Sequence, residues 1–136
     1  MAYNSNVTEG FLETYLNSMP HYSFSDIPLE SPIPVMWWRS VYSSTNGFAF
    51  ESFLDELAHA AGTDPLAFRR NYFWDARYHE LANRLEEVSG WKNRKPNEGW
   101  GVAITECFSS IVGEVVKVSR KPDGKIKIDK VWSVMD

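Results

Sequence analysis

The side chains that could bind a metal ion or act as a nucleophile are few and scattered in this sequence. The histidines are His21, His59 and His79, and no two of them have the spacing that would place two imidazoles on one helix face. Cys107 is the single cysteine and has no histidine near it in sequence, which is typical of a buried thiol rather than of a nucleophile. We therefore predict no metal site, no disulfide and no cysteine-bound iron–sulfur cluster within this chain.

The paired carboxylates fall where the hydrophobic pattern predicts the outward faces of helices. Asp55–Glu56 and Glu86–Glu87 are two such pairs, and solvation is the ordinary explanation for them. General acid–base catalysis instead needs a carboxyl group that is desolvated in a cleft. The sequence also lacks the glycine-rich nucleotide loops, the G-x-S-x-G elbow and the H-E-x-x-H zinc motif. These general motifs therefore predict no catalytic residue.

The composition predicts one soluble globular domain. The chain has 136 residues, of which 43% are apolar, and 18 Asp and Glu outnumber 14 Lys and Arg. No block of Lys and Arg is longer than two residues, which argues against nucleic acid as a partner. The apolar stretches are far shorter than the roughly 20 residues that span a bilayer, and the N-terminus has no signal-peptide pattern. We therefore expect no membrane insertion.

Residues 1–43 are predicted to form an extended aromatic arm with one short helix. Phe11, Leu12, Tyr15 and Leu16 have helical spacing, and Thr8 is a candidate cap. The prolines that follow are Pro20, Pro28, Pro32 and Pro34. Because proline removes a backbone donor and biases the residue before it toward extended geometry, this stretch is expected to lie along another surface.

Residues 44–90 are predicted to be helical. One apolar stripe at helical spacing comprises Phe50, Phe53, Leu54, Leu57, Ala58 and Ala61. The residues that this stripe places on the outward face are Glu51, Asp55, Glu56 and His59. Gly62 ends the first helix, and Asp64 with Pro65 starts a second one over about 65–72. A third helix is expected from Asp75 to Ser89, before Gly90.

Residues 99–136 are predicted to form an antiparallel meander. Val116 and Val118, then Ile126 and Ile128, alternate with polar residues, which is typical of strands. The turn between them is Lys121-Pro122-Asp123-Gly124, and residues 101–106 are a further strand candidate. About three helices followed by about three strands indicate an α+β fold in a single domain, 1–136, with one sheet edge left unpaired.

Two blocks of sequence give more specific information about the family than the composition does. The first runs from Pro34 to Arg70 and contains W-R-S-V, F-x-x-E-S-F-x-D-E-L-A and D-P-x-x-F-R; the second runs from Gly99 to Asp136. Together they resemble the large, molybdopterin-binding subunit of molybdenum hydroxylases, the superfamily of xanthine dehydrogenase and aldehyde oxidase. Within it, the chain looks most like the isoquinoline 1-oxidoreductase beta-subunit group.

This resemblance implies a function and a site. The parent reaction would be hydroxylation of an N-heteroaromatic or aldehyde carbon, with molybdopterin as the cofactor. The loop near the cofactor and the substrate pocket would be Arg39, Ser40 and Val41. Implied partners are the remainder of the molybdopterin-binding subunit and an iron–sulfur subunit, in the cytoplasm or the periplasm. Tyr42 and Ser109 depart from the family, which usually has glycine at both positions.

The family's catalytic parts are missing from this chain. Neither the G-G-x-E-M-G-Q-G-type cofactor loop nor the late glutamate that serves as the base has a counterpart here. The chain therefore resembles an internal fragment, an excised segment or a truncated gene product, and we expect it to bind no cofactor and to be inactive alone. The alternative is a free-standing, non-catalytic interaction module that uses Trp37, Trp38 and Tyr42 as its interface. A separate structural interpretation of Arg39 is that it packs the arm onto the helix together with the two tryptophans.

Overall fold

The computed structural model describes residues 9–10, 14–23, 25, 27, 29–36, 38–95 and 97–136. A 3₁₀ turn, η1 (Leu16–Ser18), precedes three α-helices. These helices are α2 (Ser43–Ala60), α3 (Pro65–Arg70) and α4 (Ala76–Ser89). A second 3₁₀ turn, η2 (Trp91–Asn93), leads into strands β1 (Gly99–Cys107), β2 (Ser110–Arg120) and β3 (Ile126–Met135). This order confirms the predicted α+β class.

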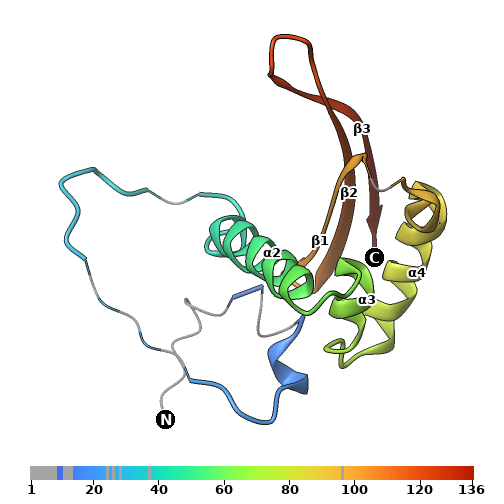
Figure 1. Ribbon diagram of the computed structural model, residues 1–136. Helices are drawn as coiled ribbons and strands as arrows, with labels where there is room; N and C mark the ends of the chain where they lie inside the picture. Colours follow the sequence, from blue (N-terminus) through green and yellow to red (C-terminus); the bar gives the residue numbers. More distant parts are fainter. Residues whose placement is uncertain are drawn as a thin grey trace.

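The three strands form an antiparallel sheet in the order β1-β2-β3 (Figure 1). Val102 pairs with Val115, which pairs in turn with Trp132. The β2–β3 register shifts at Lys117/Val118, and beyond that point the hairpin projects away from the helices. Helix α4 lies on the side of β2 and β3, whereas α2 lies beside β1.

The start of α3 and the end of α4 follow the predicted caps. The Asp64 side chain accepts the Ala67 N–H, and Pro65 occupies the first turn of α3. Asp75, which was expected to begin the third helix, instead caps α4, and α4 ends before Gly90, which has φ 71°. Glycine adopts this left-handed conformation without the clash that a Cβ would introduce.

The core lies between α4 and one face of the sheet. Its most buried side chains include Tyr78, Leu81, Leu85, Trp91, Val102, Ile104, Ile111 and Val115. Gly113 lets α4 approach the sheet, because a Cβ there would lie 2.5 Å from Leu81 Cδ2. The outward face of the sheet is more open, and both Ile126 and Ile128 are exposed.

The predicted inward face of α2 is partly wrong. Leu54 and Ala58 are buried as expected, but Phe53 is exposed and Glu51 is buried instead. The helix is rotated so that Glu51 shares a face with Leu54 and Ala58. A buried arginine, described below, needs a charged partner at this position. This need outweighs the gain from burying the whole apolar stripe.

The arm has no regular secondary structure and lies away from the core. Its described residues over 20–36 form no helix or strand, and Leu29, Val35 and Met36 are exposed. The predicted helical residues Thr8, Phe11 and Leu12 lie outside the described residues, whereas Tyr15 and Leu16 are buried at η1. No helix in the described part of the chain has the length and apolarity needed to cross a bilayer. The division into the segments 1–43, 44–90 and 99–136 stays a prediction.

Candidate functional site

The W-R-S-V loop leads directly into the N-terminus of α2. Ser40 and Val41 have φ values of 68° and 43°, which is costly for the β-branched Val41. Two hydrogen bonds hold this geometry: Val41 N–H donates to Trp38 O at 3.1 Å, and Ser43 N–H donates to Ser40 O at 2.9 Å. Tyr42 has φ −75°, so the backbone at this position does not require glycine.

The side chain of Arg39 is exposed at this loop. Within the part of the chain that the structure describes, its guanidinium has no ion-pair or hydrogen-bond partner. Trp38 is 77% exposed and Tyr42 is also exposed, so neither of them packs Arg39 into a core. Trp37 lies outside the described residues. The loop therefore presents the Arg39 cation to its surroundings.

The donors of this loop are suited to an anionic or carbonyl-bearing group. The guanidinium of Arg39 offers fixed N–H donors and carries a permanent positive charge. The N–H groups of Val41 and Ser43 are used inside the loop, so contact with a ligand falls mainly to the Arg39 side chain. The chemistry of this donor set fits a molybdopterin cofactor with its phosphate, or a polar substrate.

A groove between α2 and the sheet starts next to this loop. It has a volume of about 450 Å³, and its lining includes Ser43, Ser44 and Phe48 from α2 and Ala103 and Val116 from the sheet. The carboxylates of Glu51 and Asp55 lie at its α2 wall. Among the described residues, no group of three or more His, Cys, Asp or Glu side chains is arranged to hold a metal ion. Cys107 is partly buried at the end of β1.

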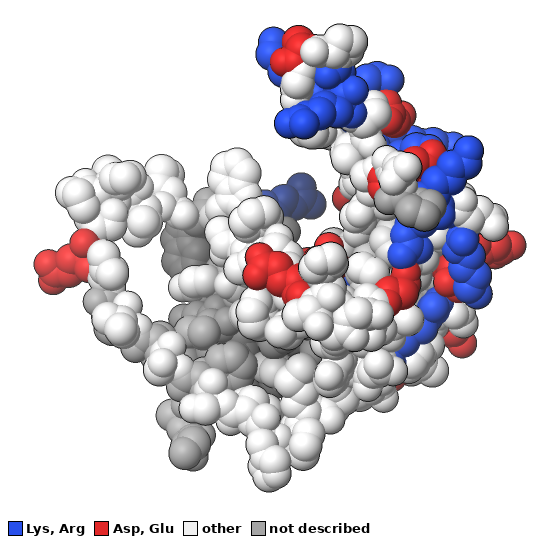
Figure 2. All heavy atoms as spheres, viewed as in Figure 1, with Lys and Arg blue, Asp and Glu red and all other residues white. Residues whose placement is uncertain are grey.

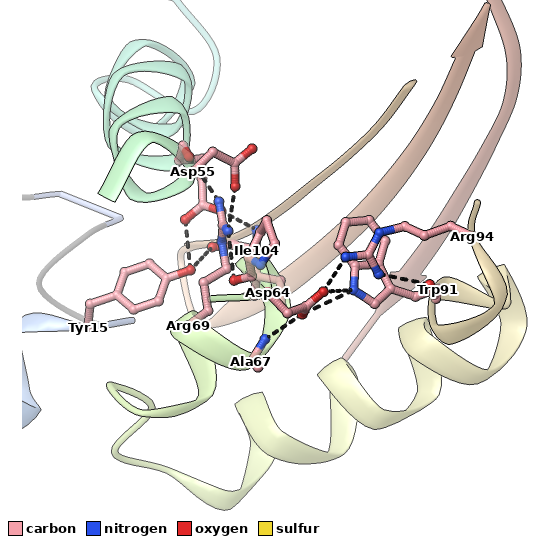
Figure 3. Close-up of polar contacts among 10 residues, drawn as sticks. Tyr15, Asp55, Asp64, Ala67, Arg69, Trp91, Arg94 and Ile104 are labelled. Atoms are coloured by element: carbon pink, nitrogen blue, oxygen red, sulfur yellow. Dashed lines mark hydrogen bonds and ion pairs between the residues drawn. The ribbon is translucent and has the colours of Figure 1, made fainter. Parts of the chain in front are cut away.

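Below the groove, a buried ion pair joins α2 to α3 (Figure 3). Arg69 Nε donates to Glu51 Oε2 at 2.8 Å, and the Arg69 side chain is fully buried. A second guanidinium nitrogen donates to the Glu51 backbone carbonyl at 2.9 Å, and a third donates to Asp55 at 2.6 Å. The guanidinium thus uses all of its nitrogens, which is the condition under which a buried cation is tolerated.

Glu51 also joins this pair to the sheet and to the N-terminal segment. Its carboxylate accepts the Ile104 N–H at 2.9 Å and the Tyr15 hydroxyl at 2.7 Å. Burial raises the pKa of the Glu51 carboxyl above its ordinary value, although Arg69 lowers it. Burial, reinforced by the charge of Glu51, also raises the pKa of Tyr15, so its hydroxyl stays protonated and donates.

A second polar cluster joins the start of α3 to η2 (Figure 3). Besides capping α3, the Asp64 carboxylate accepts Trp91 Nε1–H at 3.0 Å and an N–H of Arg94. The Arg94 guanidinium also lies over the Trp91 ring, 3.8 Å from its centroid. Burial works against ionisation of Asp64, but the N–H of Ala67 and the charge of Arg94 outweigh it and lower its pKa.

Replacing Asp64 with alanine is expected to lower the free energy of unfolding by about 2 kcal/mol, through the lost cap and an unpaired Trp91 N–H. Because the pKa of Asp64 is lower in the folded state, its charge stabilises the fold above the unfolded pKa, about 4, and this stabilisation is lost as pH falls through the folded value. Urea unfolding at neutral and acidic pH measures both effects. The exposed Glu87→Ala is the control, with a loss of about 0.5 kcal/mol or less. Equal losses for the two variants would contradict this role.

Several acidic side chains that the sequence pattern predicted to be solvated form ion pairs in the structure. Glu51 and Asp55 were expected on a solvated face, yet both bind Arg69. Glu86, expected to be solvated, pairs with Arg70 at 3.2 Å and with Lys92 at 3.1 Å. The sequence did contain an indication of the Glu51–Arg69 pair. Glu51 is the first glutamate of F-x-x-E-S-F-x-D-E-L-A, and Arg69 is the arginine of D-P-x-x-F-R.

Comparison with known proteins confirms the resemblance. The chain is 34% identical over 80 residues to a nicotinate dehydrogenase subunit of Pseudomonas putida, an alignment that covers 55% of this chain and 7% of that protein. It is 25% identical over 125 residues to the beta subunit of isoquinoline 1-oxidoreductase from Brevundimonas diminuta, covering 82% of this chain and 16% of that protein. The chain thus spans less than a fifth of either relative. No family model and no solved structure matches it.

Proposed function

We propose that this sequence is part of the molybdopterin-binding subunit of a molybdenum hydroxylase, and that Arg39 contacts the cofactor or the substrate there. The observation that supports the proposal best is the contrast between two arginines of the matched block. Arg69 is buried with every nitrogen bound, whereas Arg39 is exposed with no described partner. A cation that does not stabilise the fold is available to a ligand.

In this proposal the chain positions groups rather than performing the chemistry. When bound, the molybdopterin cofactor supplies the two-electron oxidation, with oxygen that derives from water. Arg39 holds an anionic or carbonyl oxygen through its N–H groups, and Ser40 and Val41 set the direction of its side chain. The Glu51–Arg69 pair fixes α2, and therefore the loop that precedes it.

We further propose that the substrate is an N-heteroaromatic compound. The relatives are named for nicotinate and isoquinoline, and both compounds are N-heteroaromatic rings. The groove beside the loop has an apolar wall at Phe48, Ala103 and Val116, which is suited to a flat ring. Arg39 precedes Ser43, the first residue of the groove's lining, by four residues. The partners in this proposal are the remainder of the subunit and an iron–sulfur subunit that removes the electrons.

Metal and pterin analysis of the whole subunit that carries this sequence tests the proposal. We expect molybdenum and pterin in about equal amounts, together with dye-linked oxidation of nicotinate, quinoline or isoquinoline. The matched control is the 136-residue chain alone, which is expected to hold neither group and to oxidise none of these compounds. A pure, folded subunit without molybdenum and pterin would contradict the proposal.

One observation favours the alternative of an interaction module. Trp38 is 77% exposed, and exposed tryptophans favour interfaces because they bury a large area at little cost in rotamer entropy. The Trp38→Ala variant separates the two functions, since a module would lose its partner without any change in bound cofactor.

A further inference from the structure

The two outer edges of the sheet differ in how their backbone groups are satisfied. At the β1 edge, Ile104 N–H donates to Glu51, and Ile104 O accepts the Tyr15 hydroxyl at 3.3 Å. At the β3 edge, the described part of the chain offers no strand and no side chain to the backbone of Ile126–Met135. Among the described residues, the β3 edge is therefore open to pairing with one more strand.

The arm has the properties of an edge strand without a partner. Residues 29–36 lie outside any helix or sheet, with a bend at Pro32 and Ile33, and Val35 and Met36 are 87% and 90% exposed. The prolines of the arm all fall at even positions: Pro20, Pro28, Pro32 and Pro34. In a strand, the N–H groups of alternate residues point to the same side. With the even positions turned outward, the N–H groups of Leu29, Ser31, Ile33 and Val35 all face a partner.

Charge complements this geometry. Residues 1–38 contain four Asp or Glu and no Lys or Arg, with Glu30 in the arm itself. Residues 117–130 contain six Lys or Arg and two Asp, and Figure 2 shows these cations gathered on the projecting hairpin. Lysines along β3 disfavour pairing of β3 with another β3, because like charges would lie together, but they favour an acidic strand.

We propose that residues 29–36 of one copy of the chain add to β3 of a second copy as a fourth strand. The arm of the same copy leaves the molecule on the side of α2 and β1, with the sheet between it and β3 (Figure 1). A second copy has no such separation. Exchange of both arms between two copies would give a closed, two-fold dimer.

Pairing would straighten the bend at Pro32 and Ile33, but it would break few existing contacts. The Ile33 N–H donates to Ser31 Oγ at 3.1 Å in an exposed turn, and a ladder bond to β3 would replace it. Ile126 and Ile128, each 64% exposed, would gain apolar neighbours from the arm. The attraction between Glu30 and the lysines of β3 would weaken with added salt.

The positions of the prolines give a matched test with the 136-residue chain. Sedimentation equilibrium is expected to show a dimer that dissociates on dilution and in high salt. Val35→Pro places a proline where an N–H must face β3, and it should abolish the dimer. Met36→Pro, next to it and equally exposed, should leave the dimer intact. A monomer at every concentration, or the same effect of both prolines, would overturn the proposal.

Cross-linking identifies the partner strand. In a Cys107→Ser background, Val35→Cys on one copy should form a disulfide with Ile128→Cys on another, and not with Arg84→Cys on the exposed face of α4. Mixing the two single-cysteine variants ensures that any such disulfide joins two copies. If Val35→Cys and Ile128→Cys form a disulfide only when both are in one chain, the arm pairs within its own copy and the proposal is wrong.

Discussion

Replacing Arg69 with methionine is expected to lower the free energy of unfolding by about 3–5 kcal/mol, the loss found when one partner of a buried ion pair is removed. The reason is the charge that remains. Glu51 is buried against Ile104 and Tyr15, and without the guanidinium its carboxylate has no compensating cation among the described residues. Urea unfolding, followed by circular dichroism, measures this loss.

Two further variants separate the buried charge from the loss of volume. Arg84→Met removes an exposed arginine that pairs with Glu87 one helical turn away, and it should cost about 0.5 kcal/mol or less. Adding Glu51→Gln to Arg69→Met should recover part of the stability, because the amide carries no charge. Equal losses for Arg69→Met and Arg84→Met would show that the buried pair does not stabilise the fold.

Local signals in the sequence predicted most of the fold. Asp64 followed by Pro65 marks the start of α3, and Asp75 with Gly90 marks both ends of α4, because caps and left-handed glycines depend only on neighbouring residues. The hairpin at Lys121–Gly124 is fixed in the same way by its own turn residues.

Long-range polar contacts could not be predicted from such signals. Glu51 binds the N–H of Ile104, which is 53 residues away, and this contact exists only once α2 lies along β1. Periodicity identifies α2 as a helix. It also places Phe53 on the inward face, but Phe53 is exposed in the structure. The family motifs carried the missing information, since Glu51 and Arg69 are both motif residues.

In the candidate site, too, the sequence predicts some features and not others. The resemblance located the Arg39 loop, but only the structure shows that Arg39 is exposed and that two loop N–H groups are already used by Trp38 and Ser40. The left-handed conformation of Val41 could not be foreseen, because a β-branched residue strongly disfavours it. Such local strain is common where a loop is shaped for a ligand.

The second large effect concerns the other arginine. Arg39→Ala in the whole subunit is expected to reduce turnover by about 100-fold, the scale on which a single donor to a reacting oxygen acts. The melting temperature of the variant subunit is expected to be unchanged, because Arg39 is exposed and pairs with no described residue. Arg84→Ala, which removes another exposed arginine, is the control and should change neither value appreciably.

Turnover and melting temperature, both measured on one sample of the Arg39→Ala subunit, test the central claim most directly: Arg69 holds the fold and Arg39 serves the ligand. The account predicts a strong loss of turnover at an unchanged melting temperature. Unchanged turnover with a melting temperature lowered by several degrees would contradict it and would assign Arg39 to the fold.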